Sequence, residues 1–77
     1  MDINGKIAVV TGGASGVGRA LSLGLADRGA AGVVVSDIDA DGAAKVAAEI
    51  EAAGHRAIAV HADVSKEAEV QALVASA

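Results

Sequence analysis

The feature that most constrains this chain is a glycine-rich stretch that directly follows a short apolar run. Residues 7–10 are all apolar, and residues 11–18 read TGGASGVG, with spaced glycines at Gly12, Gly16 and Gly18. Because glycine has no Cβ, the backbone can turn sharply from a strand into a helix there and can approach a ligand closely. Unpaired amides at the start of that helix, together with its dipole, favour phosphate. The stretch therefore predicts a strand, a tight turn and a helix whose first turn can bind a phosphate or pyrophosphate.

Composition narrows the remaining possibilities. A chain of 77 residues makes at most one small domain, which buries only about 60% of its unfolded surface. It has no aromatic residue, Pro or Cys, so the core must consist of Ala, Val, Ile and Leu, and neither a disulfide nor a thiolate metal site can form. A net charge of −4 argues against a nucleic-acid partner. No apolar run approaches the ~20 residues of a membrane span. We therefore expect a cytoplasmic protein that contains no metal and does not bind nucleic acid or membranes.

Hydrophobic periodicity predicts alternating strands and helices along the chain. The predicted strands and helices, in order, are Lys6–Thr11, Gly16–Arg28, Val33–Val35, Ala40–Ala53 and Arg56–His61. Ser65 is placed to cap a third helix, whose apolar stripe continues through Val70, Leu73, Val74 and Ala77. Such short connections favour a parallel sheet with right-handed crossovers. The predicted fold class is α/β, a Rossmann-type doubly wound sheet with its first three strand–helix units in strand order 3-2-1.

The predicted units leave the first strand without one neighbour. In the doubly wound order the first strand is central and pairs with a fourth. With no fourth strand predicted, residues 7–10 would form an exposed apolar edge, which favours association. The third helix would lie on the opposite face from the first two, largely uncovered. We interpret residues 1–77 as the amino-terminal part of a single dinucleotide-binding domain, poorly stable or self-associating when made alone.

An acidic residue follows the second predicted strand. Asp37 lies roughly twenty positions beyond Gly18, as in dinucleotide-binding units. A carboxylate there accepts a hydrogen bond from a ribose 2′-hydroxyl but repels a 2′-phosphate, which favours NAD over NADP. The alternative for Asp37 is a carboxylate that caps the second helix, for which Asp39 is better placed. Arg19 could reach a phosphate, although a solvated helix arginine is the commoner case.

Three segments of the chain carry a family resemblance. They are residues 4–20 (NGKIAVVTGGASGVGRA), 33–37 (VVVSD) and 61–65 (HADVS). With the T-G-x-x-x-G-x-G spacing and the two later acids, the chain resembles the short-chain dehydrogenase/reductase family over essentially all of its length. The resemblance implies an NAD cofactor and hydride transfer between NAD(H) and an alcohol or ketone. It also implies a homo-oligomer, a dimer or tetramer, to which the third helix contributes.

The same resemblance implies where the cofactor lies. The residues that would line its ribose and pyrophosphate are Gly12, Ser15, Gly16, Val17 and Gly18. Asp37, with Ile38 beside it, would bind the adenosine ribose. Asp63 and the backbone of Val64 would meet the adenine ring. Without the resemblance, Asp63 is equally well explained as a turn or cap residue.

The residues that perform the family's reaction are missing from this sequence. That reaction uses a tyrosine with a nearby lysine, and a serine and an asparagine that orient the carbonyl. The chain has no Tyr and its only Asn is Asn4, so we assign no catalytic residue and expect no hydride transfer from these 77 residues alone. His61 would lie at the adenine end and His55 in a turn, so neither replaces the tyrosine. A nucleotide-binding module without turnover, or another Rossmann enzyme such as an epimerase or a methyl-donor-dependent transferase, remains an alternative.

Overall fold

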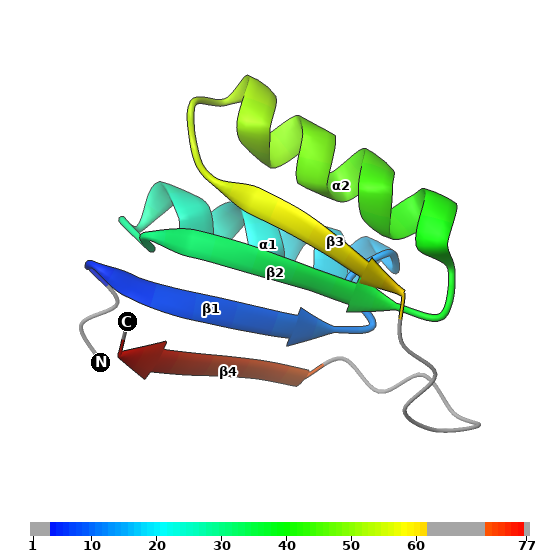
Figure 1. Ribbon diagram of the computed structural model, residues 1–77, viewed down its shortest axis with the longest axis horizontal. Coiled ribbons are helices and arrows are strands. Elements are labelled where there is room, and N and C mark those ends of the chain that lie inside the picture. Colours follow the sequence, from blue (N-terminus) through cyan, green and yellow to red (C-terminus); the bar gives the residue numbers. More distant parts are fainter. Residues whose placement is uncertain (1–3, 62–70, 77) are drawn as a thin grey trace.

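A computed structural model describes residues 4–61 and 71–76 of the chain. In this part, four strands form one sheet in the order β3-β2-β1-β4 (Figure 1). The helices and strands, in chain order, are β1 (Lys6–Thr11), α1 (Gly16–Asp27), β2 (Gly32–Asp37), α2 (Ala40–Ala52), β3 (Ala57–His61) and β4 (Gln71–Ser76). The predicted α/β class and the parallel order of the first three strands are confirmed.

Strands β1, β2 and β3 run parallel, and each parallel pair is joined by a helix. Val9 of β1 pairs with Val34 of β2, which in turn pairs with Ile58 of β3. Glycines end both helices: Gly29 and Gly54 follow the cap residues of α1 and α2 with φ of 97° and 91°. This left-handed backbone is far easier for glycine than for other residues, so it stops each helix at a defined position.

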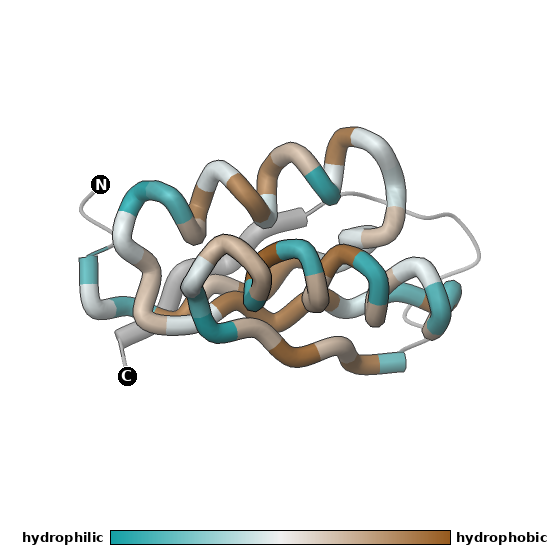
Figure 2. Tube along the Cα trace, turned by 90° about the horizontal axis from the view of Figure 1, so that it is seen from above, coloured by the Kyte–Doolittle hydropathy of each residue, from teal (hydrophilic) through white to brown (hydrophobic). Residues whose placement is uncertain are grey.

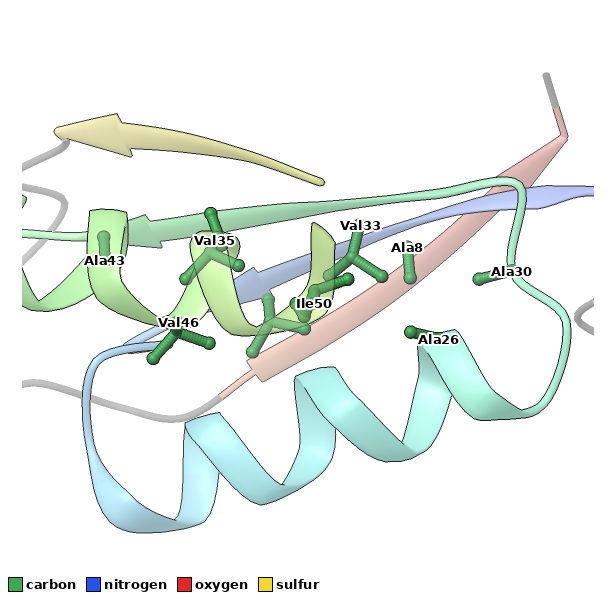
Figure 3. Close-up of a cluster of buried hydrophobic side chains, with 10 residues drawn as sticks. Ala8, Ala26, Ala30, Val33, Val35, Ala43, Val46 and Ile50 are labelled. Carbon is green, nitrogen blue, oxygen red and sulfur yellow. The ribbon is translucent and has the colours of Figure 1, made fainter. Parts of the chain in front are cut away.

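One face of the sheet carries the core, and both helices cover that face. The core residues are Ala8, Val10, Ala26, Ala30, Val33, Val35, Ala43, Val46, Ala47 and Ile50. Figure 3 shows Ala26 of α1 and Ile50 of α2 directed towards Ala8 and Val33 of the sheet. Hydrophilic residues recur at intervals along α2, as expected for a helix with one buried side, whereas the middle of α1 carries mostly apolar residues (Figure 2). These contacts fix where the turns at the strand ends lie.

The structure differs from the sequence prediction at the final described segment. Gln71–Ser76 forms a strand, not a helix, and pairs antiparallel with β1 from Thr11↔Gln71 to Lys6↔Ser76 (Figure 1). The predicted third helix is therefore wrong over these residues, and so is the predicted free edge of β1. The physical reason is that the backbone N–H and C=O groups along this edge of β1 need partners. A short apolar segment can supply them, because its periodicity does not distinguish strand from helix. The predicted cap Ser65 and the stripe residues Val70 and Ala77 lie outside the described residues.

Among the described residues, no helix is long and apolar enough to cross a bilayer.

Candidate functional site

The three spaced glycines of the turn between β1 and α1 have different structural roles. Gly12 has φ of 69°, in the left-handed region where the chain turns. A Cβ on Gly18 would overlap the carbonyl oxygen of Gly12 and would lie 2.8 Å from Cα of Gly13. A Cβ on Gly16, by contrast, would meet no atom within 4 Å. Gly12 therefore turns the chain, Gly18 allows α1 to pack on the turn, and Gly16 leaves an open approach to the backbone.

Ser15 holds the glycine-rich turn together. It is the N-cap of α1, and its Oγ accepts a hydrogen bond from the Gly18 amide at 3.0 Å. The same hydroxyl donates to the carbonyl oxygen of Gly12 at 2.9 Å. Because the hydroxyl proton and one lone pair are used in this way, Ser15 fixes the distance between the first and third glycines of the motif.

The first turn of α1 presents unpaired amides to the open space at Gly16. Among the described residues, the Gly16 and Val17 amides have no protein acceptor. The side chain of Val17 is 70% exposed, so it does not cover this end of the helix. No acidic residue lies in the first turn. Two free donors and the positive end of the helix dipole therefore make a site that can bind a phosphate group.

Asp37, the last residue of β2, lies beside this turn. Its Oδ2 accepts a hydrogen bond from the Ala14 amide at 2.8 Å, and its Oδ1 accepts one from the Asp39 amide at 2.9 Å. The residue is only 8% exposed, so these bonds replace part of the hydration that burial removes. Each carboxylate oxygen can accept more than one hydrogen bond, and Asp37 can therefore still accept from a hydroxyl.

Asp39, and not Asp37, caps the second helix. Asp39 is the N-cap of α2, and its Oδ1 accepts a hydrogen bond from the Gly42 amide at 3.1 Å. Asp37 instead joins the end of β2 to the glycine-rich turn. Ile38, between them, is 54% exposed and adjoins the same edge of the sheet.

The remaining candidates are Arg19, near the start of α1, and two residues outside the described part of the chain. Arg19 pairs with another side chain: its Nε donates to Oε2 of Glu49 in α2 at 2.8 Å. This hydrogen bond raises the pKa of Arg19, and the guanidinium stays charged. The predicted adenine-contacting residues Asp63 and Val64 lie outside the described residues.

The two histidines lie at opposite ends of the segment that contains β3. His61 ends β3, next to Asp37 in the parallel register, and is exposed. Nε2 of His55 is 3.4 Å from Oδ1 of Asp27. No group of three metal-ligating side chains occurs within the part of the chain that the structure describes.

Sequence reasoning missed two residues that shape this site, Ala14 and Gly42. Ala14 supplies the amide that Asp37 binds. Gly42, in the first turn of α2, lies so close to Ala14 that a Cβ there would be 2.8 Å from the Ala14 Cβ. The only sequence signal was a glycine within a predicted helix, where glycine is unfavourable unless packing requires it.

A glycine-rich turn before a helix and a carboxylate at the end of the next strand are the parts of a dinucleotide-binding unit. Residues 6–77 match the family described as short chain dehydrogenase. The chain belongs to this family, and the predicted resemblance is confirmed.

Two curated relatives and one solved structure illustrate the similarity. The chain is 52% identical over 69 residues to a cis-4-hydroxycyclohexanecarboxylate dehydrogenase of Sinomonas cyclohexanicum, covering 90% of this chain and 27% of that protein. It is 51% identical over 81 residues to a hydroxyacyl-CoA dehydrogenase of Mycobacterium tuberculosis, covering 99% and 25%. A 7α-hydroxysteroid dehydrogenase solved with NADH and 7-oxo glycochenodeoxycholic acid superposes with a TM-score of 0.75 at 43% identity, covering 79% and 24%. The chain thus spans about a quarter of the length of these relatives.

Proposed function

We propose that residues 1–77 are the amino-terminal, NAD-binding part of an oxidoreductase that transfers hydride between NAD(H) and an alcohol or carbonyl substrate. The observation that carries the proposal is the position of the Asp37 carboxylate, held beside the glycine-rich turn by the Ala14 amide at 2.8 Å. An acceptor for ribose hydroxyls and donors for phosphate thus lie at one edge of the sheet. The family membership and the NADH bound in a related structure support the same function.

The described residues fit the cofactor in the following way. The pyrophosphate would lie over the open side of Gly16 and accept hydrogen bonds from the Gly16 and Val17 amides. Gly12, Ser15 and Gly18 give the turn its shape. Asp37, with Ile38 beside it, would bind the adenosine ribose, and Asp63 and Val64 are proposed to contact the adenine. The nicotinamide of the bound cofactor supplies or accepts the hydride.

Asp37 also favours NAD over NADP. Its carboxylate is bonded on both oxygens to backbone amides, so it cannot turn away from a 2′-phosphate without losing a hydrogen bond. A second negative charge at that distance is repelled. We further propose that the tyrosine and lysine of the family's proton transfer lie elsewhere in the protein that carries this sequence. That protein would be a cytoplasmic homo-oligomer acting on a small alcohol or ketone.

Calorimetric titration of the protein that carries this sequence with NAD and with NADP tests the proposal. We expect NAD to bind at least about tenfold more tightly, a difference of about 1.4 kcal/mol. Ile38→Arg places a guanidinium next to Asp37 and should improve NADP binding. Ile58→Arg is the matched control, because Ile58 is similarly exposed, at 59%, and lies on β3; it should change neither affinity. Equal or tighter binding of NADP by the unsubstituted protein would refute the assignment of Asp37.

A further inference from the structure

The start of α2 packs so closely against the glycine-rich turn that Gly42 cannot carry a side chain unless its neighbours move. A Cβ on Gly42 would lie 2.8 Å from Cβ of Ala14 and 2.5 Å from Oδ2 of Asp39. The Asp39 carboxylate is the end of a side chain and can rotate away. The Ala14 methyl is fixed to the backbone of the turn, so the turn itself would have to move. The methyl of Ala14 therefore decides whether Gly42 can be replaced.

Conformational freedom does not explain the glycine at position 42. Among the described residues, positive φ occurs at Gly5, Gly12, Gly29 and Gly54, and Gly42 has no such angle. In a helix, glycine costs about 1 kcal/mol relative to alanine. Gly42 has no positive φ that would require glycine, so its close approach to Ala14 is the reason that glycine is found there.

We propose that Gly42 is a positioning residue for the adenosine half of the cofactor site. This inference rests on the function proposed above. Because Gly42 lacks a side chain, α2 can begin against Ala14 and keep the Ala14 amide within reach of Asp37. Gly42 acts only through Ala14 and Asp37 and does not touch the cofactor.

Three hydrogen bonds connect these residues in series. The Ala14 amide donates to Oδ2 of Asp37 at 2.8 Å, the Asp39 amide donates to Oδ1 of Asp37 at 2.9 Å, and the Gly42 amide donates to Oδ1 of Asp39 at 3.1 Å. The Asp37 carboxylate is thus held from both sides. If Ala14 moves, Oδ2 loses its donor and the carboxylate can rotate away from the ribose hydroxyls. The ribose contacts that distinguish NAD from NADP would weaken with it.

Gly42→Ala tests the inference, with Gly24→Ala as the matched control. Gly24 also lies in a helix, but a Cβ there would meet nothing within 4 Å. In the protein that carries this sequence, we expect Gly42→Ala to weaken NAD binding about tenfold and to reduce the preference for NAD over NADP. Gly24→Ala should change neither. A loss of overall stability alone would not alter the preference between the two cofactors.

The double variant Ala14→Gly/Gly42→Ala identifies the contact responsible. Removing the Ala14 methyl makes room for the new Cβ, so most of the lost NAD affinity should return. If Gly42→Ala binds NAD as well as the unsubstituted protein does, the positioning role is refuted, and failure of the double variant to recover would refute the role of Ala14.

Hydrogen exchange at the Ala14 amide gives a readout that needs neither a variant nor a cofactor. The bond to Asp37 predicts slow exchange in the unsubstituted protein, and rapid exchange in the folded protein would overturn the inference. If the unsubstituted protein binds no NAD, the proposed function fails, while the Ala14 measurement still decides whether the connection to Asp37 exists.

Discussion

Alanine substitutions at two glycines of one motif should separate cofactor binding from stability. Gly16 and Gly18 belong to the same turn, but a Cβ on Gly16 would meet nothing within 4 Å, whereas one on Gly18 would overlap the Gly12 carbonyl oxygen. We expect Gly16→Ala to leave the protein stable and to lose NAD. Gly18→Ala should destabilise the protein and lose NAD as well.

The expected magnitudes follow from these surroundings. At Gly16 an alanine adds helix propensity of up to about 1 kcal/mol and no clash. Its methyl would project into the open space beside Gly16, where we propose that the pyrophosphate lies. Each hydrogen bond to a charged phosphate is worth about 1.5–3 kcal/mol, so loss of one predicts a fall in NAD affinity of about ten- to a hundredfold. Gly16→Ala should therefore lower the affinity for NAD while it raises the stability of the protein or leaves it unchanged.

At Gly18 the obstacles are backbone atoms, which cannot move as a flexible side chain would. The new Cβ would lie 2.8 Å from Cα of Gly13 in addition to the overlap with Gly12. Overpacking of this kind costs about 1–3 kcal/mol, and the gain in helix propensity offsets about 1 kcal/mol of it. Because the clash is with backbone atoms, we expect the upper end of that range and a net loss of about 2 kcal/mol.

Thermal unfolding and calorimetric titration with NAD measure the two effects on the same samples. Gly24→Ala is the control for added helix propensity, because it has open space and lies outside the motif. It should raise the melting temperature slightly and leave NAD affinity unchanged. The reasoning is refuted if Gly16→Ala binds NAD with unchanged affinity, or if Gly18→Ala melts at the temperature of the unsubstituted protein.

Two further pairs of substitutions test the core and the helix surface. Ile50 is fully buried at 0% exposure, whereas Ile58 is 59% exposed. Unfolding measurements should show a loss of about 2–5 kcal/mol of stability for Ile50→Ala and little change for Ile58→Ala. Equal losses would contradict the described core. Arg19→Ala and Glu49→Ala should leave NAD affinity unchanged, because the two exposed side chains bind each other. If Arg19 bound a phosphate of the cofactor, Arg19→Ala alone would weaken binding in the same titration.

Local signals account for the parts of the fold that the sequence predicted correctly. The boundaries of β1 and α2 follow from apolar periodicity and from residues that act on their immediate neighbours. Asp39 begins α2 through a bond to the amide of Gly42, and Gly54 ends it with φ of 91°. The glycine-rich turn was predicted from the spacing of its own glycines. The bonds that cap the two helices join residues only three positions apart in the sequence.

The parts that were missed depend on contacts between distant segments. Gln71–Ser76 pairs with β1. The sequence of those six residues does not indicate that the edge of β1 needs a partner. The approach of Gly42 to Ala14 depends on how α2 packs against the turn. Local propensity cannot report either contact, because tertiary pairing overrides it where backbone groups would otherwise stay unpaired.

The bonds of Asp37 also change how its role can be tested. From the sequence alone, Asp37 is expected only to accept a hydrogen bond from the ribose. On that basis, Asp37→Ala would remove a negative charge and relax the preference for NAD over NADP. In the structure, the same substitution also removes the acceptor of the Ala14 and Asp39 amides. An unpaired buried donor costs about 1–3 kcal/mol. The turn that should bind pyrophosphate loses one of its hydrogen bonds to β2 and keeps the one from the Gly13 amide to the Ser36 carbonyl oxygen. Loss of affinity in Asp37→Ala would therefore mix electrostatic and structural causes. Substitution at the exposed Ile38 changes the charge beside the ribose while leaving those bonds in place, and it is the cleaner test of cofactor preference.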